Sequence, residues 1–259
     1  MTESAIADLL QKDPYLKPYE PVLRRRLAAI RLREKSLTQG PGSLADFASG
    51  HEYFGLHGDA AGWVFREWAP NATAIFLICE ATGWRETDAY RLRRISREGA
   101  WELRLPPEAF SHGDLFRLRM HWSEGAGDRI PAWTRRVVQD PETLIFNAQV
   151  WVPETPYRWR HPGFVPLDGP LLIYEAHVGM AQDAEKIGSY HEFTELILPR
   201  IAAAGYNALQ LMAIQEHPYY GSFGYQVSSF FAASSRYGPP EDLKALVDTA
   251  HGMLSLIHI

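Results

Sequence analysis

The feature that most constrains the fold is one stretch, residues 206–231, in which a short apolar run leads directly into a loop rich in aromatic residues. The run reads NALQLMAI and has the length and the clustered apolar residues of a buried parallel strand. The loop reads QEHPYYGSFGYQVSSFF. Loops at the carboxyl ends of parallel strands are where α/β barrels hold their functional groups. We therefore predict a parallel α/β unit with a site at this strand end.

The flanking segments extend this unit into the order strand, helix, strand, loop, helix. Residues 171–179, LLIYEAHVG, predict a second buried strand, and residues 191–204 have a helical pattern. Two prolines, Pro239 and Pro240, open another helix whose first turn carries acidic residues, as the helix dipole favours. Its apolar face is expected to contain Leu243, Leu246, Val247 and Ala250.

Residues 51–151 have a different pattern, with short runs of strand formers separated by turns. Examples are GWVFREWAP, ATAIFLICE, AWELRLPP and DLFRLRMHW. Strands spaced this closely predict an antiparallel sandwich of about a hundred residues. Residues 130–170 predict a strand pair followed by an ordered connector. The expected sandwich core comprises Trp63, Phe65, Ile75, Leu77, Trp101 and Leu103.

The first 37 residues predict two helices that prolines separate. The longer helix places Leu23, Leu27, Ile30 and Leu37 at helical spacing, which gives it one apolar face. Three consecutive arginines, residues 24–26, are read as a solvated helix face. The segment QGPGSLADF then breaks the helical pattern with glycine and proline.

Composition excludes several classes of protein. The 259 residues are 46% hydrophobic and 22% charged, which is enough to bury one or two cores. A net charge of -5 argues against a nucleic-acid partner, and no stretch approaches the roughly 18 apolar residues of a membrane span. A single cysteine, Cys79, permits no disulfide framework. The simplest location is the cytoplasm.

Several phrases carry a resemblance to a known family: IYEAHVGM, LPRIAAAGYNALQLMAI, EHPYYGSFGYQVSSFFAASSRYG and PEDLKALVDTAH. Together with DPYLKPYEPVLRRR near the start, they resemble the amino-terminal part of eukaryotic-type glycogen or starch branching enzymes of the α-amylase superfamily. The resemblance implies a multidomain chain: a helical segment (1–45), an all-β immunoglobulin-like sandwich that is a carbohydrate-binding module (46–150), a connector (151–170), and the truncated first part of an α/β (β/α)8 TIM barrel (171–259).

Tryptophans are candidate sugar contacts because sugar rings stack their apolar faces on aromatic planes. For any single tryptophan a core position is the better expectation. Trp68, at a strand end, and Trp84, after a turn glycine, are the better candidates for sugar contact. The resemblance implies one glucan site that joins the helical segment, the sandwich and the barrel. It would comprise Gly40, Pro41, Trp68, Ala69, Pro70, Trp84, Arg97, Glu98, Gly99, Ala100 and Arg117. The sequence differs from the family at residues 97–100, where an aspartate, tyrosine, glycine and lysine are usual.

At the predicted barrel mouth, Glu216 and His217 follow the strand and have two open interpretations. They could bind substrate, with His217 the candidate, or they could hold the loop by pairing with each other or with backbone amides. Taken alone, Tyr225 would be read as a buried tyrosine. The resemblance implies instead that it is an aromatic platform beneath the reacting sugar, with Gly224 allowing close backbone approach and Tyr219 and Tyr220 lining the same cleft.

The resemblance also implies what this chain lacks. Retaining glycosyl transfer uses two carboxyl groups about 5–5.5 Å apart, and the family carries them on later barrel strands. We therefore expect no catalytic residue here. The last residues, MLSLIHI, depart from the family pattern, which suggests a truncated or mis-assembled reading frame. With two or at most three of eight strands, residues 171–259 are expected to be unstable alone, whereas residues 51–150 could fold independently.

Two functions follow as hypotheses. The preferred one is the amino-terminal part of a 1,4-α-glucan branching enzyme, a glycosyltransferase of glycogen biosynthesis that moves an α-1,4-linked chain to a 6-hydroxyl. The alternative is a non-catalytic glucan-binding fragment, and a debranching or trehalose-forming relative is a weaker third. The expected partner is an α-glucan such as glycogen, amylose or a maltooligosaccharide, and the parent enzyme is expected to be monomeric. No metal and no organic cofactor is expected, since no His/Asp/Glu cluster has ligand spacing.

Overall fold

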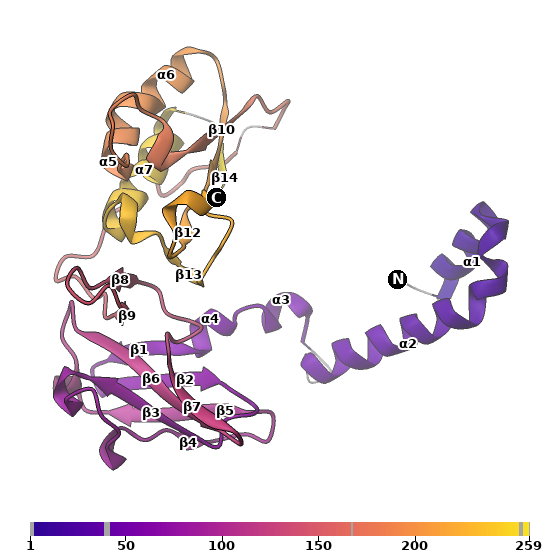
Figure 1. Ribbon diagram of the computed structural model, residues 1–259. Coiled ribbons are helices and arrows are strands. Elements are labelled where there is room, and N and C mark those ends of the chain that lie inside the picture. Colours follow the sequence, from indigo (N-terminus) through magenta and orange to yellow (C-terminus); the bar gives the residue numbers. More distant parts are fainter. Residues whose placement is uncertain (1–2, 39–41, 167, 254–255, 259) are drawn as a thin grey trace. The chain divides into compact units, whose positions relative to one another are not determined.

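The computed structural model describes residues 3–38, 42–166, 168–253 and 256–258, and divides into two compact units, residues 1–53 and 54–259 (Figure 1). The first unit is helical. Its prolines separate a leading helix from a longer one, as predicted, and Ile6, Leu10 and Leu27 form its small core. Ile30, on the predicted apolar face, is 60% exposed, because the short leading helix covers only the first part of the longer one. The elements are α1 (Glu3–Lys12), η1 (Pro14–Tyr19), α2 (Glu20–Leu37), α3 (Leu44–Phe47) and α4 (Gly50–Tyr53).

The second unit begins with a sandwich of two antiparallel sheets, which confirms the predicted fold of this region. One sheet has the strand order β1-β2-β5-β4, and the other has β3-β6-β9-β8 with β7 paired to β6. Strands β1 and β7 were not predicted from the sequence. The strands are β1 (Gly55–Asp59), β2 (Gly62–Trp68), β3 (Ala74–Cys79), β4 (Arg93–Arg94), β5 (Ala100–Leu105), β6 (Leu115–Trp122), β7 (Gly125–Arg129), β8 (Val137–Gln139) and β9 (Phe146–Gln149), with short helices η2 (Glu80–Thr82), η3 (Asp88–Tyr90) and η4 (Pro107–Ala109).

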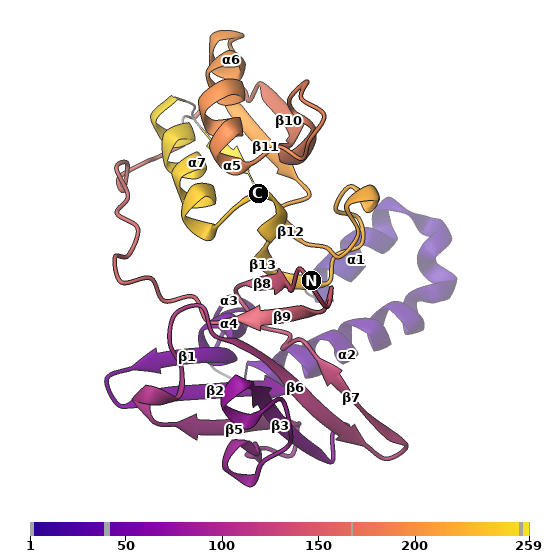
Figure 2. The same cartoon turned by 60° about the vertical axis from the view of Figure 1, so that its left-hand side comes forward.

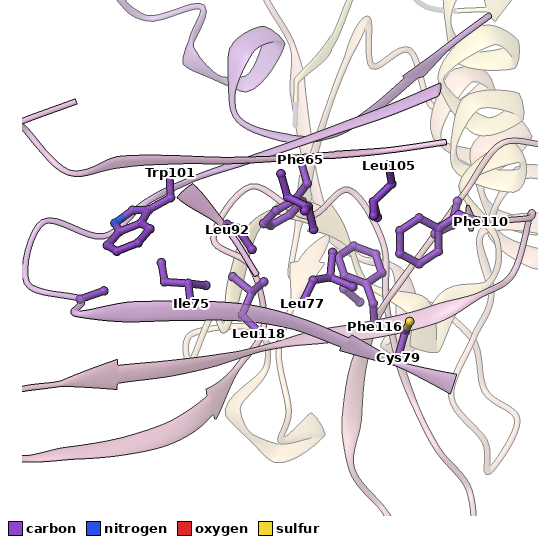
Figure 3. Packing of buried hydrophobic residues seen from close by; sticks show 14 residues of the cluster. Phe65, Ile75, Leu77, Cys79, Leu92, Trp101, Leu105, Phe110, Phe116 and Leu118 are labelled. Carbon is purple, nitrogen blue, oxygen red and sulfur yellow. The ribbon is translucent and has the colours of Figure 1, made fainter. Parts of the chain in front are cut away.

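The sandwich core lies between the two sheets, where alternate residues of facing strands meet (Figure 3). Phe65, Ile75 and Leu77 are at most 1% exposed, as predicted for core positions. Trp101 is also buried, and its indole N–H donates to the carbonyl oxygen of Ala69 at 3.0 Å. Trp63 packs at the margin of this core and is only partly buried.

After a connector, the chain forms the α/β unit, in which a parallel sheet of order β10-β11-β14 packs against helices (Figure 2). A two-stranded antiparallel pair, β12 and β13, follows the central strand. The strands are β10 (Ile173–His177), β11 (Ala208–Met212), β12 (Gln215–Glu216), β13 (Ser229–Ala233) and β14 (Leu256–His258); the helices are η5 (Val178–Met180), α5 (Tyr190–Glu192), the π-helical η6 (Phe193–Ile197), α6 (Leu198–Ala203), η7 (Tyr220–Ser222), η8 (Ser235–Tyr237) and α7 (Pro240–Met253).

Strand β10 corrects one prediction, because its first half is not buried. Ile173 is 51% exposed and Tyr174 is 37% exposed, and the preceding Leu171 and Leu172 are also exposed. Strand β10 is an edge strand whose partner in the described sheet is β11, so its outer side has no neighbour there. The apolar run was read correctly as a strand, but its burial requires more sheet than the described residues supply.

The connector between sandwich and barrel is fastened at one buried charge, Asp248 of α7, which is 0% exposed. Its carboxylate accepts hydrogen bonds from the Tyr157 hydroxyl at 2.8 Å and from the backbone amides of Arg160 and His161 at 2.8 and 2.9 Å. The Arg160 side chain adds a contact at 3.2 Å, and His161 Nδ1 one at 3.1 Å. These bonds hold the connector against α7. Asp248 was not predicted from the sequence, in which only the apolar face and the acidic first turn of α7 stood out.

Candidate functional site

One end of the sandwich carries a compact tip, residues 68–70 together with residues 97–100. Trp68, the last residue of β2, is 55% exposed, and its indole N–H donates to the carbonyl oxygen of Glu98 at 2.9 Å. The backbone N–H of Ala69 donates to the carbonyl oxygen of Gly99 at 2.8 Å. Trp68 and Ala100 are also paired residues of β2 and β5. The structure therefore brings these predicted residues together.

A glycine and an arginine hold this tip closed. Gly99 has a φ of +103°, and a β-carbon there would lie 2.6 Å from the nitrogen of Pro70, so a larger residue could not take this position unchanged. The Arg94 guanidinium donates to the carbonyl oxygens of Pro70 and Arg97, each at 3.1 Å. The exposed indole of Trp68 thus stands on a rigid base, which suits a stacking surface for a sugar ring.

Trp84 and Arg117 form a separate pair. The Arg117 guanidinium lies 5.1 Å from the centre of the Trp84 ring, and its Nη1 lies 3.2 Å from an Asp128 carboxylate oxygen. Trp84 follows the end of β3, with its backbone N–H bonded to Cys79, whereas the tip precedes the start of β3. A six-residue strand spans about 20 Å. The structure therefore splits the single predicted site into two regions. Gly40 and Pro41 lie outside the described residues.

Beyond β11, Glu216 and His217 are both 0% exposed. The backbone N–H of Ser235 donates to Glu216 Oε2 at 2.8 Å, and His217 Nδ1 lies 2.9 Å from the carbonyl oxygen of Gln215. Burial raises the pKa of Glu216, and the hydrogen bond from Ser235 opposes that rise. The expectation that His217 binds substrate is corrected, because a fully buried imidazole cannot reach a sugar from solvent. Of the two interpretations, loop support is the one this geometry fits.

Tyr225 stands on the loop between β12 and β13 with 81% of its surface exposed, which overturns the reading of a buried tyrosine. Gly224 has a φ of +84°, and a β-carbon there would lie 2.5 Å from the β-carbon of Ala213, so the predicted close approach is confirmed. The Tyr220 hydroxyl donates to the carbonyl oxygen of Gly179 at 3.1 Å. The loop is therefore held against the carboxyl ends of β10 and β11.

Beneath this loop lies a group of buried polar atoms that the sequence analysis missed. His177, the last residue of β10, is 9% exposed, and the rings of Tyr220, Phe223 and Tyr237 surround it at 5.9–6.3 Å. Burial lowers the pKa of His177, which disfavours the protonated imidazole. Among the described residues, neither His177 nitrogen has a hydrogen-bond partner, and the Tyr237 hydroxyl has none. The available signal was the position of His177 at a strand end.

The residues that the structure describes contain no group of three or more His, Cys, Asp or Glu side chains arranged to hold a metal ion. Within the same residues, no helix combines the length and the apolar character needed to cross a membrane.

The chain is similar to a known domain family and to several known proteins. Residues 53–141 match carbohydrate-binding module 48, the isoamylase N-terminal domain. The chain is 43% identical over 251 residues to a 1,4-alpha-glucan-branching enzyme of Rhizophagus irregularis, covering 93% of this chain and 36% of that protein. It is 41% identical over 252 residues to the enzyme of the same name from Equus caballus, covering 95% of this chain and 36% of the relative.

Solved structures share the fold at lower identity. Pullulanase from Bacillus acidopullulyticus superposes with a TM-score of 0.65 at 17% identity, over 80% of this chain and 29% of that chain. A pullulanase from Anoxybacillus sp. LM18-11, complexed with maltotriose, gives a TM-score of 0.62 at 19% identity, over 79% of this chain and 33% of that chain. At these identities the likeness concerns the fold.

The sandwich matches a carbohydrate-binding module, and it is followed by a parallel α/β unit in an arrangement whose fold the solved pullulanases share. Over nearly its whole length, the chain is similar to part of the 1,4-alpha-glucan-branching enzymes named above. It spans little more than a third of the length of the curated relatives it matches.

Proposed function

We propose that this chain is the glucan-binding amino-terminal part of a 1,4-α-glucan branching enzyme, which cleaves an α-1,4 linkage and transfers the chain to a 6-hydroxyl. The observation that carries the proposal is Tyr225, which is 81% exposed on a loop fastened to the carboxyl ends of β10 and β11. A flat aromatic ring at that place offers a stacking surface to a glucosyl unit. Trp68, on the sandwich tip, offers a second such ring.

We propose that this chain binds glucan and that bond cleavage belongs to the part of the relatives' length that the chain does not span. Retaining transfer needs a nucleophilic carboxylate and an acid/base carboxyl about 5 Å apart and open to the substrate. Glu216, which follows β11, is 0% exposed and has one oxygen bonded to Ser235, so it can neither attack an anomeric carbon nor exchange protons with a sugar. We therefore propose that these 259 residues bind glucan without branching it.

We also propose the polymer, the cellular compartment and the oligomeric state of the parent enzyme. The proposed polymer is glycogen, since both the resemblance and the relatives named above concern branching of 1,4-α-glucans. The proposed compartment is the cytoplasm, in keeping with the single buried cysteine, Cys79. We also propose that the parent enzyme acts as a monomer, which gel filtration coupled to light scattering would test.

The experiment is a maltoheptaose titration of the chain and of two truncation variants, Trp68→Ala and Tyr225→Ala. Each variant is expected to weaken binding about 3- to 10-fold, because an aromatic contact contributes roughly 0.5–1.5 kcal/mol. Tyr225→Phe keeps the ring and should bind like the parent. Trp159→Ala is the control, since Trp159 is 46% exposed on the connector. Unchanged affinity in both truncation variants would refute the proposed binding surfaces.

A further inference from the structure

The loop that carries Tyr225, residues 217–228, has a strained backbone. Phe223 has a φ of +52°, in the left-handed region that a bulky side chain rarely adopts. Ala213, which follows β11, has a φ of +63°, and Gly224 packs directly on it. Residues in this region persist only where the surrounding structure holds them there. The position of Tyr225 therefore depends on contacts that keep the loop from relaxing.

Tyr220 makes such a contact with the turn after β10. Its ring is partly buried against the core of the α/β unit, and its hydroxyl donates to the carbonyl oxygen of Gly179 at 3.1 Å. A side chain at position 179 would disturb this arrangement, because a β-carbon there would lie 3.0 Å from the Tyr220 hydroxyl oxygen and 2.8 Å from Tyr237 Cε1. The turn and the loop are therefore closely fitted to each other.

His177 supports both Tyr220 and Phe223 from below. The rings of Tyr220 and Phe223 each meet the His177 ring edge to face, with centres 6.0 and 6.3 Å away and interplanar angles of 87° and 82°. This is a favourable arrangement for aromatic rings. The hydroxyl donor and the strained residue thus pack on the same buried side chain at the end of β10.

The backbone of the loop connects Tyr220 to Tyr225. The backbone N–H of Phe223 donates to the carbonyl oxygen of Tyr220 at 3.0 Å, and the N–H of Tyr225 donates to the carbonyl oxygen of Ser222 at 3.0 Å. Two successive turns therefore join the anchored ring to the exposed one. A movement of Tyr220 would displace Tyr225 with it.

We propose that Tyr220 is a positioning residue for glucan binding, whose hydroxyl bond to Gly179 holds the strained loop in the conformation that presents the Tyr225 ring. The loop has a held and a relaxed state, and a glucan that stacks on Tyr225 favours the held state. The proposal rests on the proposed function, namely that Tyr225 stacks on an α-glucan. Tyr220 acts through Tyr225 and needs no contact with the sugar.

The test is Tyr220→Phe, which removes the hydroxyl and keeps the ring. The carbonyl oxygen of Gly179 also accepts from the backbone N–H of Gly188 at 3.0 Å, so it keeps a partner in this variant. We expect little change in urea denaturation and a 2- to 10-fold weaker affinity for maltoheptaose, about the factor that loss of one hydrogen bond gives. The backbone amides of Phe223 and Tyr225 should exchange hydrogen faster, because the relaxed state is more populated.

Two further variants separate positioning from a structural effect. Tyr157→Phe is the matched control, since its hydroxyl donates to Asp248 at 2.8 Å in the connector. It should lower stability and leave the affinity for maltoheptaose unchanged. In a Tyr225→Ala background, Tyr220→Phe should cause no further loss of affinity, because its effect requires the Tyr225 ring.

The outcomes distinguish this proposal from the proposed function. If Tyr225→Ala weakens binding and Tyr220→Phe does not, the positioning role is wrong and the proposed function stands. Equal losses from Tyr220→Phe with and without the Tyr225 ring would also overturn it, because Tyr220 would then act independently. If Tyr225→Ala leaves the affinity unchanged, the proposed stacking surface on this loop fails, and the positioning role fails with it.

Discussion

At the scale of single residues, Asp248 is the buried group with the clearest energetic consequence. Its carboxylate accepts five hydrogen bonds from Tyr157, Arg160 and His161, and it is 0% exposed. Asp248→Ala would leave these donors without an acceptor. We expect a loss of about 3 kcal/mol in the free energy of unfolding, measured by urea denaturation. Asp183→Asn, at an exposed loop carboxylate, is the control and should change stability little.

The same residue predicts a dependence on pH. Burial alone would raise the pKa of Asp248, but its hydrogen bonds outweigh burial and hold the pKa below the ordinary value. A carboxyl with a depressed pKa in the folded state contributes stability above its unfolded pKa, near 4, and this stability is lost as the pH falls further. Unfolding of the parent chain should therefore become easier below about pH 4. An Asp248→Asn variant with the same acid dependence as the parent would contradict this assignment.

Residue by residue, the sequence predicted the tip better than the barrel mouth. Trp101 and Trp68 were separated correctly into a core and an exposed residue, because one alternates with polar neighbours and the other ends a strand. His217 was misread, since a polar residue after a strand can face either solvent or the interior, and only its burial decides between them. The separation of Trp84 from the tip depends on which end of β3 each occupies, which motif matching does not consider.

At the scale of elements, the loop that carries Tyr225 depends on one glycine. Gly224→Ala would place a β-carbon 2.5 Å from that of Ala213 and would strain a φ of +84°. We expect a loss of about 2 kcal/mol in the free energy of unfolding, together with weaker maltoheptaose binding. Gly163 has open space around it, so Gly163→Ala is the matched control and should be neutral or slightly stabilising. Equal stability of the two variants would show that the close approach is unimportant.

A stack of three aromatic rings joins the sandwich to β13. Trp133 lies 4.5 Å from Phe231 with an interplanar angle of 24°, and 5.3 Å from Phe54 with an angle of 19°. Trp133→Ala should lower the free energy of unfolding of the barrel part by about 2 kcal/mol, whereas Trp133→Phe should restore most of it. Hydrogen exchange of the β13 amides is the measurement. Unchanged exchange in Trp133→Ala would mean that the stack does not couple the two parts.

The order of elements could be predicted because periodicity and turn residues are local sequence signals that indicate helices and strands. The strands β1 and β7 were missed because they are short and rich in glycine, and pairing with β2 and β6 provides the order that their own sequences lack. The exposure of Ile173 could not be foreseen for a related reason. Whether an apolar strand is buried depends on its neighbours in the sheet, which its own residues do not specify.

At the scale of the whole molecule, the two parts of the second unit should differ in stability. The sandwich has a closed core between two sheets, whereas β10 exposes apolar residues along an open edge. We expect native-state hydrogen exchange to show strong protection in β3 and β6 and weak protection in β10 and β11, with residues 54–150 folding when expressed alone. Equal protection throughout, with a single cooperative unfolding transition, would show that the barrel strands need no further partners.

We propose that this chain binds α-glucan through the exposed rings of Trp68 and Tyr225 but does not itself perform branching. The most direct test pairs a maltoheptaose titration of the purified chain with an iodine-staining assay on amylose. We predict saturable binding, weakened in Trp68→Ala and Tyr225→Ala, with no change in the iodine spectrum of amylose. Branching by these 259 residues would contradict this proposal and would require an acid/base pair of exposed carboxyl groups, such as Asp183 and Glu185.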